Sequence, residues 1–536
     1  MEDLITALAL LCAVATLGTL SKRVSLPLPI LQVAGGALLS LAPGFNNIHL
    51  KPEVFFALFI PPLLFSDGWF IPKREFARVV RPVLLLALGL VALTVIMVGY
   101  LIHAIIPAIP LAAGFALGAV ISPTDAVAVS SITKRLSLHP RVTNVVNGES
   151  LVNDASGLLA FKFAVAAVST GVFSMETAVV NFFVLSIGGI LMGLVVAWVI
   201  GMVRVWLVRG DISEPSIQTT LSLLTPFAAY FPAVQLHVSG ILAVVAAGIY
   251  AGIHDTRNLT TADRLQTSEV WTVVLFAFNG MAFILLGLQL PTVIAGIKGH
   301  HWSDLTAYAL ILSAGVILLR LAWVYPGAHI PRWLIRSIRE QEAKPTPGQI
   351  FIVGWSGIRG SVNLAAALSL PLTTTMGEAF PERNLLIFLA GSVIVITLLV
   401  HGLTLPTLIR WFEVSGDGAA EREEQMARIA VARAAIERIK QHVIPESDPH
   451  EQAFAGQLIA WYERKIEHLE ADENDREDFD TQIKVERNLR LNAISAERDE
   501  LLRLHANRSI NEETLRIIQR EIDHLESALP PSTRTL

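Results

Sequence analysis

Long apolar segments recur along the first 414 residues of this chain, and they constrain its fold more than any other feature. Each segment is close to the about 20 residues that an α-helix needs to cross the about 30 Å hydrocarbon core of a bilayer. The chain is 53% hydrophobic and only 16% charged, which leaves too little polar surface for a soluble protein of 536 residues. We therefore predict an all-α, multi-span membrane protein.

Charged residues and Pro/Gly breaks divide the apolar region into about thirteen predicted spans. Their approximate ranges are 3–21, 26–44, 52–71, 82–106, 110–131, 142–170, 175–203, 215–231, 236–253, 269–291, 303–325, 349–371 and 384–411. Alternate connections are rich in basic residues, beginning with Lys22 and Arg23, whereas the intervening connections carry only Lys51, Lys298 and Arg383. Because basic connections stay on the cytoplasmic side, this alternation predicts an external N-terminus and a cytoplasmic C-terminus.

The composition changes sharply near residue 415. Residues 415–536 hold 17 Lys+Arg against 26 Asp+Glu, whereas residues 1–414 hold 24 against 20. We predict a transmembrane domain over 1–414 and a charged, helical cytoplasmic tail over 415–536. The acidic tail and the mildly basic membrane domain give no indication of nucleic-acid binding. A solvated helical domain is the simplest interpretation of the tail, and regulation or self-association is the alternative.

Several functional classes lack their characteristic sequence features here. Cys12 is the only cysteine, so there is no disulfide framework or thiolate metal cluster. Glu2 and Asp3 precede the first apolar segment where a signal peptide would carry basic residues, so we expect a retained membrane helix. The sequence contains no His-Glu-x-x-His pattern, nucleophile elbow or phosphate-binding glycine-lysine loop, which disfavours an intramembrane hydrolase and an ATP-driven pump.

Polar residues interrupt the fifth span at Ser122-Pro123-Thr124-Asp125. Ionisable side chains at mid-membrane cost about 2.5–3.5 kcal/mol each and therefore mark functional sites. Proline removes a backbone donor and clashes with the preceding turn, so we expect freed carbonyls and short side-chain oxygens to face one cavity. Unwound helices of this kind coordinate small cations in transporters. The alternative is a simple kink in which neighbouring helix ends satisfy Asp125.

The sixth span contains Gly148-Glu149-Ser150 followed by Asn153-Asp154. A helix that enters from the cytoplasmic side near residue 142 places Asp154 about 18 Å deep, close to the bilayer centre. Ser150 and Asp154 are four residues apart and share a helix face, whereas Glu149 is rotated by about 140° from Asp154. We therefore expect Asp154 to face an ion cavity and Glu149 to face a partner helix.

The twelfth span contains a buried arginine, Arg359, between Gly357 and Gly360. The glycines weaken the helix and allow close approach of another backbone. Arg359 lies about 15 Å from the cytoplasmic start of its span. A buried guanidinium stays charged and needs a carboxylate, and we predict Glu149 as its partner.

The interrupted spans five and twelve are seven spans apart, so their chains run in opposite directions through the membrane. Two discontinuous helices of opposite sense are typical of an inverted repeat, with a binding site where they cross. We predict that spans one to six repeat as spans eight to thirteen, with span seven as a linker.

Three further charged residues lie in apolar spans: Asp67, Lys162 and Arg320. Asp67 either adds a third carboxylate to the cavity or lies at a helix interface near the cytoplasmic end of its span. Lys162 and Arg320 are more typical of structural counter-charges or snorkelling side chains than of ligands.

Taken together, these segments resemble the monovalent cation:proton antiporter family, in particular its bacterial, NhaP-like sodium/proton exchangers, which are related to the animal sodium/hydrogen exchangers. The matching residues are Pro61-Pro62, Asp67-Gly68, Ser122-Pro123-Thr124-Asp125, Gly148-Glu149-Ser150, Asn153-Asp154 and Gly357-Ile358-Arg359-Gly360. The resemblance covers about residues 1–412. Each motif alone is weak, but the set in this order is specific.

The resemblance implies a secondary transporter, not an enzyme, that exchanges Na+ or Li+ for H+ without a cofactor or ATP. The residue roles that it implies are cation and proton binding for Asp154, Ser150, Thr124 and Asp67, with Na+ held at Asp154, Ser150 and Thr124, and support of the site for Asp125, Asn153, Glu149 and Arg359. It also implies a homodimer in the plasma (bacterial inner) membrane, with a core domain that moves against a dimerisation domain.

A carboxylate that holds either one cation or one proton gives obligatory exchange without other machinery. Asn153 stands where related antiporters carry a second aspartate, which favours one-for-one, electroneutral exchange. A K+/H+ antiporter of the same fold remains an alternative. A cation channel would instead need a symmetric filter or a ring of acids, and saturable counter-transport distinguishes the two. A sensor that only binds cations is the remaining alternative.

Overall fold

The computed structural model describes most of the chain. The described residues are 2–24, 27–42, 52–133, 136, 138–171, 175–297, 299, 301–336, 340, 344–375, 377–414, 416, 418–443, 448–471, 473–527 and 529. Lys51 and Lys298, which entered the topology prediction, lie outside them. The chain divides into two compact units, Met1–Gly416 and Asp417–Leu536.

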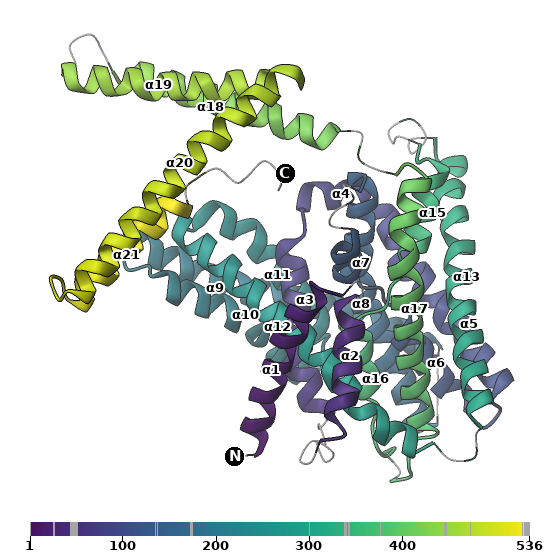
Figure 1. Ribbon diagram of the computed structural model, residues 1–536. Coiled ribbons are helices and arrows are strands. Elements are labelled where there is room, and N and C mark those ends of the chain that lie inside the picture. The colour runs from purple at the N-terminus through teal and green to yellow at the C-terminus, as the bar shows by residue number, and fades with distance from the viewer. Residues whose placement is uncertain are drawn as a thin grey trace. The chain divides into compact units, whose positions relative to one another are not determined.

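The first unit is helical, and each predicted apolar span contains at least one helix (Figure 1). Its helices are α1 (Glu2–Ser21), α2 (Leu28–Leu39), α3 (Pro52–Phe70), α4 (Lys73–Leu84), the π-helical turn η1 (Leu85–Leu90), α5 (Val91–Ile105), α6 (Leu111–Ile121), α7 (Ala126–Thr133), α8 (Pro140–Thr170), α9 (Met175–Arg209), α10 (Pro215–Gln235), α11 (Gly240–Asn258), α12 (Thr261–Ala295), α13 (Trp302–Leu334), α15 (Pro347–Trp355), α16 (Ser361–Leu368) and α17 (Arg383–Trp411). Within the described residues, seven helical segments are long and apolar enough to cross a bilayer. The protein is therefore an all-helical, multi-span membrane protein.

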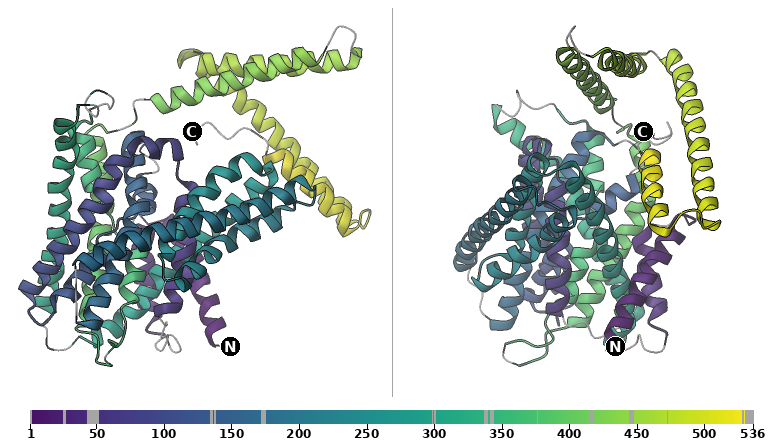
Figure 2. Two further views of the ribbon diagram at one scale, coloured as in Figure 1. Left: turned by 180° about the vertical axis from the view of Figure 1, so that it is seen from behind. Right: turned by 90° about the vertical axis from the view of Figure 1, so that its left-hand side faces the viewer.

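Two groups of helices can be distinguished by their packing. The crossing group consists of α4–α8 with η1, α13 and α15–α17, and the flanking group consists of α1–α3 and α9–α12. Helices α9, α10 and α11 lie side by side and run obliquely to α13 and α17, as Figure 1 and the left view of Figure 2 show. The groups meet where α3 and α12 of the flanking group pack against α16 of the crossing group, and also where α12 packs against α17 and where α3 and α11 pack against α8.

Two helical breaks lie at the centre of the crossing group. Residues 122–125 separate α6 from α7, and residues 356–360 separate α15 from α16. The first break follows from Pro123, because proline cannot donate the backbone hydrogen bond that would continue the helix. The second is rich in glycine, which tolerates irregular backbone. Both breaks fall in the two segments for which the sequence predicts discontinuous helices.

Each break supplies the hydrogen bonds that the other one lacks. The main-chain amide of Asp125 donates to the Ile358 carbonyl at 2.7 Å. The carbonyl freed at Ile121 accepts from Arg359 Nε at 3.0 Å. Asn363 Nδ2 donates to two further carbonyls, of Val120 and Pro123, at 2.9 Å each. Because buried backbone groups must be satisfied inside a membrane, these bonds fix the two breaks against one another.

Within its described residues, the second unit contains four helices, α18 (Ala419–His442), α19 (Pro449–Glu470), α20 (Glu473–Ala506) and α21 (Glu512–Ser527). Helices α20 and α21 bury a small core made of Ile494, Leu501, Leu515 and Ile522. Arg498 of α20 reaches Asp523 and Glu526 of α21 at 2.7 Å each. Exposed ion pairs contribute little each, so the small apolar core defines how α20 and α21 pair.

Candidate cation and proton site

One pocket collects polar side chains from both helix groups. It is lined by Leu63 and Asp67 of α3, Thr124 and Asp125 of the first break, Val127 of α7, Ser150 and Asp154 of α8, Leu275 and Asn279 of α12, Gly360 of the second break, and Ser361, Val362 and Asn363 of α16. All four residues for which the sequence suggests cation or proton binding line this pocket. Three of the lining residues are aspartates, so the pocket is acidic.

Asp154 is the most deeply placed of these aspartates, with 4% of its surface exposed. Ser150 and Asp154 line the same pocket because they lie one helical turn apart on α8. Among the residues that the structure describes, none donates a hydrogen bond to the Asp154 carboxylate or lies within ion-pair distance of it. A buried carboxylate without a protein partner is an unusual and costly arrangement, and it suits a group whose partner is a transported ion.

Asp125 instead has several partners in the protein. Its Oδ1 accepts a hydrogen bond of 3.0 Å from the Ala128 amide, at the N-terminal end of α7. The carboxylate also accepts from the amide of Ser361, the first residue of α16. A carboxylate at a helix N-terminus is stabilised by the helix dipole. Asp125 thus holds the starts of two half-helices together while one side of it lines the pocket.

Gly360 is required by this arrangement. A Cβ atom at residue 360 would collide with the Asp125 carboxylate, so Gly360→Ala must displace Asp125 from the two helix starts. Loss of a helix cap costs about 0.5–2 kcal/mol, and we expect cation/proton exchange to fall about tenfold. The matched control is Gly327→Ala in α13, where no atom lies within 4 Å of the added methyl group. Exchange assays in vesicles on both variants test this prediction, and equal activity would contradict it.

Thr124 and Ser150 connect the first break to α8. Ser150 Oγ accepts from the Ala126 amide at 3.3 Å. Thr124 Oγ1 accepts from Asn153 Nδ2 at 2.9 Å and donates to Glu149 Oε1 at 3.3 Å. These contacts hold α8 against the break, so both hydroxyls are fixed at the pocket wall.

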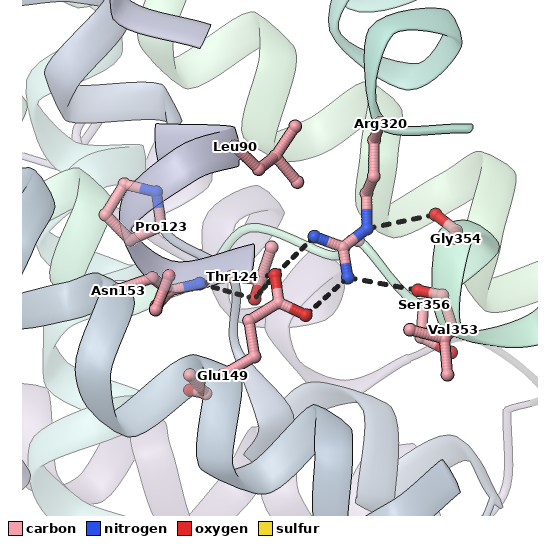
Figure 3. Close-up of polar contacts among 12 residues, drawn as sticks. Leu90, Pro123, Thr124, Glu149, Asn153, Arg320, Val353, Gly354 and Ser356 are labelled. Carbon is pink, nitrogen blue, oxygen red and sulfur yellow. Dashed lines mark hydrogen bonds and ion pairs between the residues drawn. The ribbon is translucent and has the colours of Figure 1, made fainter. Parts of the chain in front are cut away.

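The sequence predicts an ion pair between Glu149 and Arg359, and this prediction is wrong, because Glu149 pairs with Arg320. The guanidinium of Arg320, on α13, contacts both carboxylate oxygens of Glu149, with Nη2 at 2.7 Å from Oε2 (Figure 3). Arg320 also donates to the carbonyls of Gly354 and Val353 at 3.0 Å each. Arg359 instead donates to the carbonyls of Ile121 and Gly357. The reason is geometric: Glu149 lies on the side of α8 that faces α13 and α15, whereas Arg359 fills the gap between the two breaks.

The sequence patterns gave no role to three polar residues of the pocket, which are Asn279, Ser361 and Asn363. Ser361 and Asn363 lie next to the Arg359 motif, so the glycine-rich break could have indicated them. Asn279 is one of two amides in the apolar segment 269–291, the other being Gln289, and an uncharged polar residue in a span is a weak signal. Lys162 is exposed on α8 and does not line the pocket, whereas Arg320 is the counter-charge of Glu149.

The comparisons with known proteins agree on one family. The family described as "Sodium/hydrogen exchanger, transmembrane" matches residues 7–411. The chain is 38% identical to the Escherichia coli protein named "Uncharacterized Na(+)/H(+) exchanger YjcE", over 99% of both chains. It is 37% identical to the sodium, potassium, lithium and rubidium/H+ antiporter of Bacillus pumilus, over 98% of this chain and 78% of that protein. The structure of the sodium proton antiporter MjNhaP1 from Methanocaldococcus jannaschii matches with a TM-score of 0.60 at 17% identity, over 76% of this chain and 98% of the other.

The family match and the 38% identical relative show that the protein is a secondary transporter, not an enzyme. Its substrates are monovalent cations and protons, and transporters of this family need no cofactor. The chain belongs to the sodium/hydrogen exchanger family.

Proposed function

We propose that this antiporter exchanges Na+ or Li+ for H+ by letting the cation and the proton compete for Asp154. One observation supports this proposal most strongly: the Asp154 carboxylate is buried, lines the pocket and has no protein partner among the described residues. Either a proton or a cation can neutralise such a group, and both cannot do so together. Competition of this kind couples the two fluxes without any other device.

The other proposed ligands are oxygen atoms at the same pocket. Ser150, Thr124 and Asp67 line it together with Asp154, and oxygen atoms are the ligands that small hard cations prefer. Na+ would bind at Asp154, Ser150 and Thr124, with Asp67 contributing a further carboxylate. Glu149 and Asn153 of α8 support the site through Thr124, and Asp125 and Arg359 support it by joining the two breaks.

We propose one-for-one, electroneutral exchange. Asn153, next to Asp154, is an amide that contacts Thr124 and does not titrate, which leaves one titrating group in the pair Asn153-Asp154. An electroneutral exchanger gains nothing from the membrane potential, which supplies about 2.3 kcal/mol per charge per 100 mV. Exchange in proteoliposomes should therefore keep the same rate when a K+ diffusion potential is imposed with valinomycin.

The larger architecture is proposed from the family resemblance and the positions of the helices. It comprises thirteen spans with an inverted repeat, an external N-terminus, a cytoplasmic tail from residue 415, and a homodimer in the plasma (bacterial inner) membrane. The pocket lies between the crossing and flanking groups. Movement of the crossing group against the flanking group would therefore expose Asp154 to one side of the membrane and then to the other.

Potassium is the alternative cation. The Bacillus pumilus relative is named as an antiporter of sodium, potassium, lithium and rubidium, so a broad cation range is the second candidate. Dequenching of a pH-sensitive dye in proteoliposomes, after addition of NaCl, LiCl or KCl, separates the two. The proposal expects saturable responses to Na+ and Li+ and a much weaker response to K+. Equal responses would favour the broad-range antiporter, and no response to any cation would contradict exchange.

A further inference from the structure

Asn279 is the one amide that the flanking group contributes to the wall of the pocket, within the described residues. It lies on α12, and its Oδ1 accepts a hydrogen bond of 2.7 Å from Ser361 Oγ. Ser361 is the first residue of α16, in the crossing group. This hydrogen bond therefore joins the two helix groups at the pocket itself.

The bond continues into the support of the cation site. The amide of Ser361 donates to the Asp125 carboxylate, which also receives the Ala128 amide at 3.0 Å. Asn279 is thereby connected through Ser361 to the starts of both half-helices, α16 and α7. The other wall residues from the flanking group are Leu63 and Leu275, which are apolar, and the acidic Asp67. Apolar contacts are non-directional and can slide, whereas a hydrogen bond weakens steeply once its length and angle change.

We propose that the hydrogen bond between Asn279 and Ser361 is a latch, which stabilises the conformation seen here and breaks when the crossing group moves. This inference rests on the alternating access proposed above. Asn279 is then a positioning residue: it sets the balance between the two conformations of the transporter and does not bind the cation. A cation ligand would contact the cation in both conformations of the transporter, whereas the hydrogen bond of the latch is present in only one of them.

The latch predicts opposite changes on the two sides of the membrane. Loss of one hydrogen bond should shift the equilibrium between the conformations about fivefold. The apparent affinity of a site falls with the population of the conformation that exposes it. Asn279→Ala should therefore raise the apparent KM for Na+ on one side, lower it on the other, and change the ratio of the two KM values about fivefold.

The test measures the apparent KM for Na+ in everted and in right-side-out membrane vesicles. Asn279→Ala, Ser361→Ala and the double variant should all change the KM ratio by the same factor, because one shared bond is lost in each. Ser361→Thr keeps the hydroxyl and should retain the wild-type ratio of the two KM values. It provides a second test of the hydrogen bond if an alanine variant does not fold. The matched control is Ser369→Ala, directly after the last residue of α16, whose hydroxyl donates a hydrogen bond of 2.7 Å to the Ala366 carbonyl of α16.

Two results would overturn the latch. If KM rises on both sides in Asn279→Ala, Asn279 is a cation ligand. If the ratio is unchanged in both alanine variants that fold and exchange, the bond does not distinguish the two conformations. Failure of the proposed function can be distinguished from failure of the latch. If the proposed function is wrong, the wild type and Ser369→Ala show no cation-dependent proton movement in either kind of vesicle.

Discussion

Asp154→Asn is expected to abolish sodium-driven proton movement, with a loss of at least about a hundredfold. Asparagine has nearly the same shape, so the pocket and the packing of α8 should persist. The amide, however, carries no charge and binds no proton in the physiological range. A cation moved into a buried site without its counter-charge loses several kcal/mol, so both halves of the exchange fail together. The measurement is dye dequenching in proteoliposomes over a range of Na+ concentrations and pH values.

The control for Asp154→Asn is the same substitution at Asp211, an aspartate outside the pocket. Asp211 is exposed between α9 and α10 and has a positive φ of 55°, a conformation that asparagine also tolerates. Asp211→Asn should keep wild-type exchange. Retained exchange in Asp154→Asn, in protein that elutes as the wild type does, would rule out Asp154 as the competing site.

The second large effect is expected from the ion pair between Glu149 and Arg320. Both side chains are about 2% exposed or less, and removing one partner of a buried pair typically costs about 3–5 kcal/mol. Glu149→Gln and Arg320→Gln should each lower the thermal midpoint of the detergent-solubilised protein strongly and reduce exchange. The double variant Glu149→Gln/Arg320→Gln should lose less stability than the sum of the single variants, because no uncompensated charge remains buried.

A double-mutant cycle also distinguishes the two arginines. The geometry predicts strong coupling between Glu149 and Arg320, since two direct hydrogen bonds join them. Coupling between Glu149 and Arg359 should be much weaker, because Arg359 donates to backbone carbonyls instead. Thermal unfolding of the single and double variants measures both couplings. Stronger coupling of Glu149 to Arg359 would show that the arrangement in Figure 3 is not the one that stabilises the protein.

The local features of the site could be predicted from the sequence because they depend on short-range rules. Pro123 cannot continue a helix, so the break before α7 follows from the residue type. Ser150 and Asp154 share a face because they are one turn apart. The same reasoning placed Glu149 on another face of α8, and that placement agrees with its contact with α13.

The partners across helices could not be predicted in this way. Two arginines, Arg320 and Arg359, lie in apolar spans, and the choice between them depends on how α13 and α15 pack against α8. Sequence spacing holds no information on that packing. Asn279 illustrates the same limit, because an amide in a span has no motif around it. Its importance appears only when α12 is placed against α16.

The most direct test of the account is to count the protons released when Na+ binds to the purified transporter. Calorimetric titration with NaCl in two buffers of different ionisation enthalpy gives this number at each pH. Competition at Asp154 predicts that proton release per bound Na+ approaches one as the pH is lowered, and that Asp154→Asn shows no release. Sodium binding to the wild type without proton release at any pH would contradict the shared site.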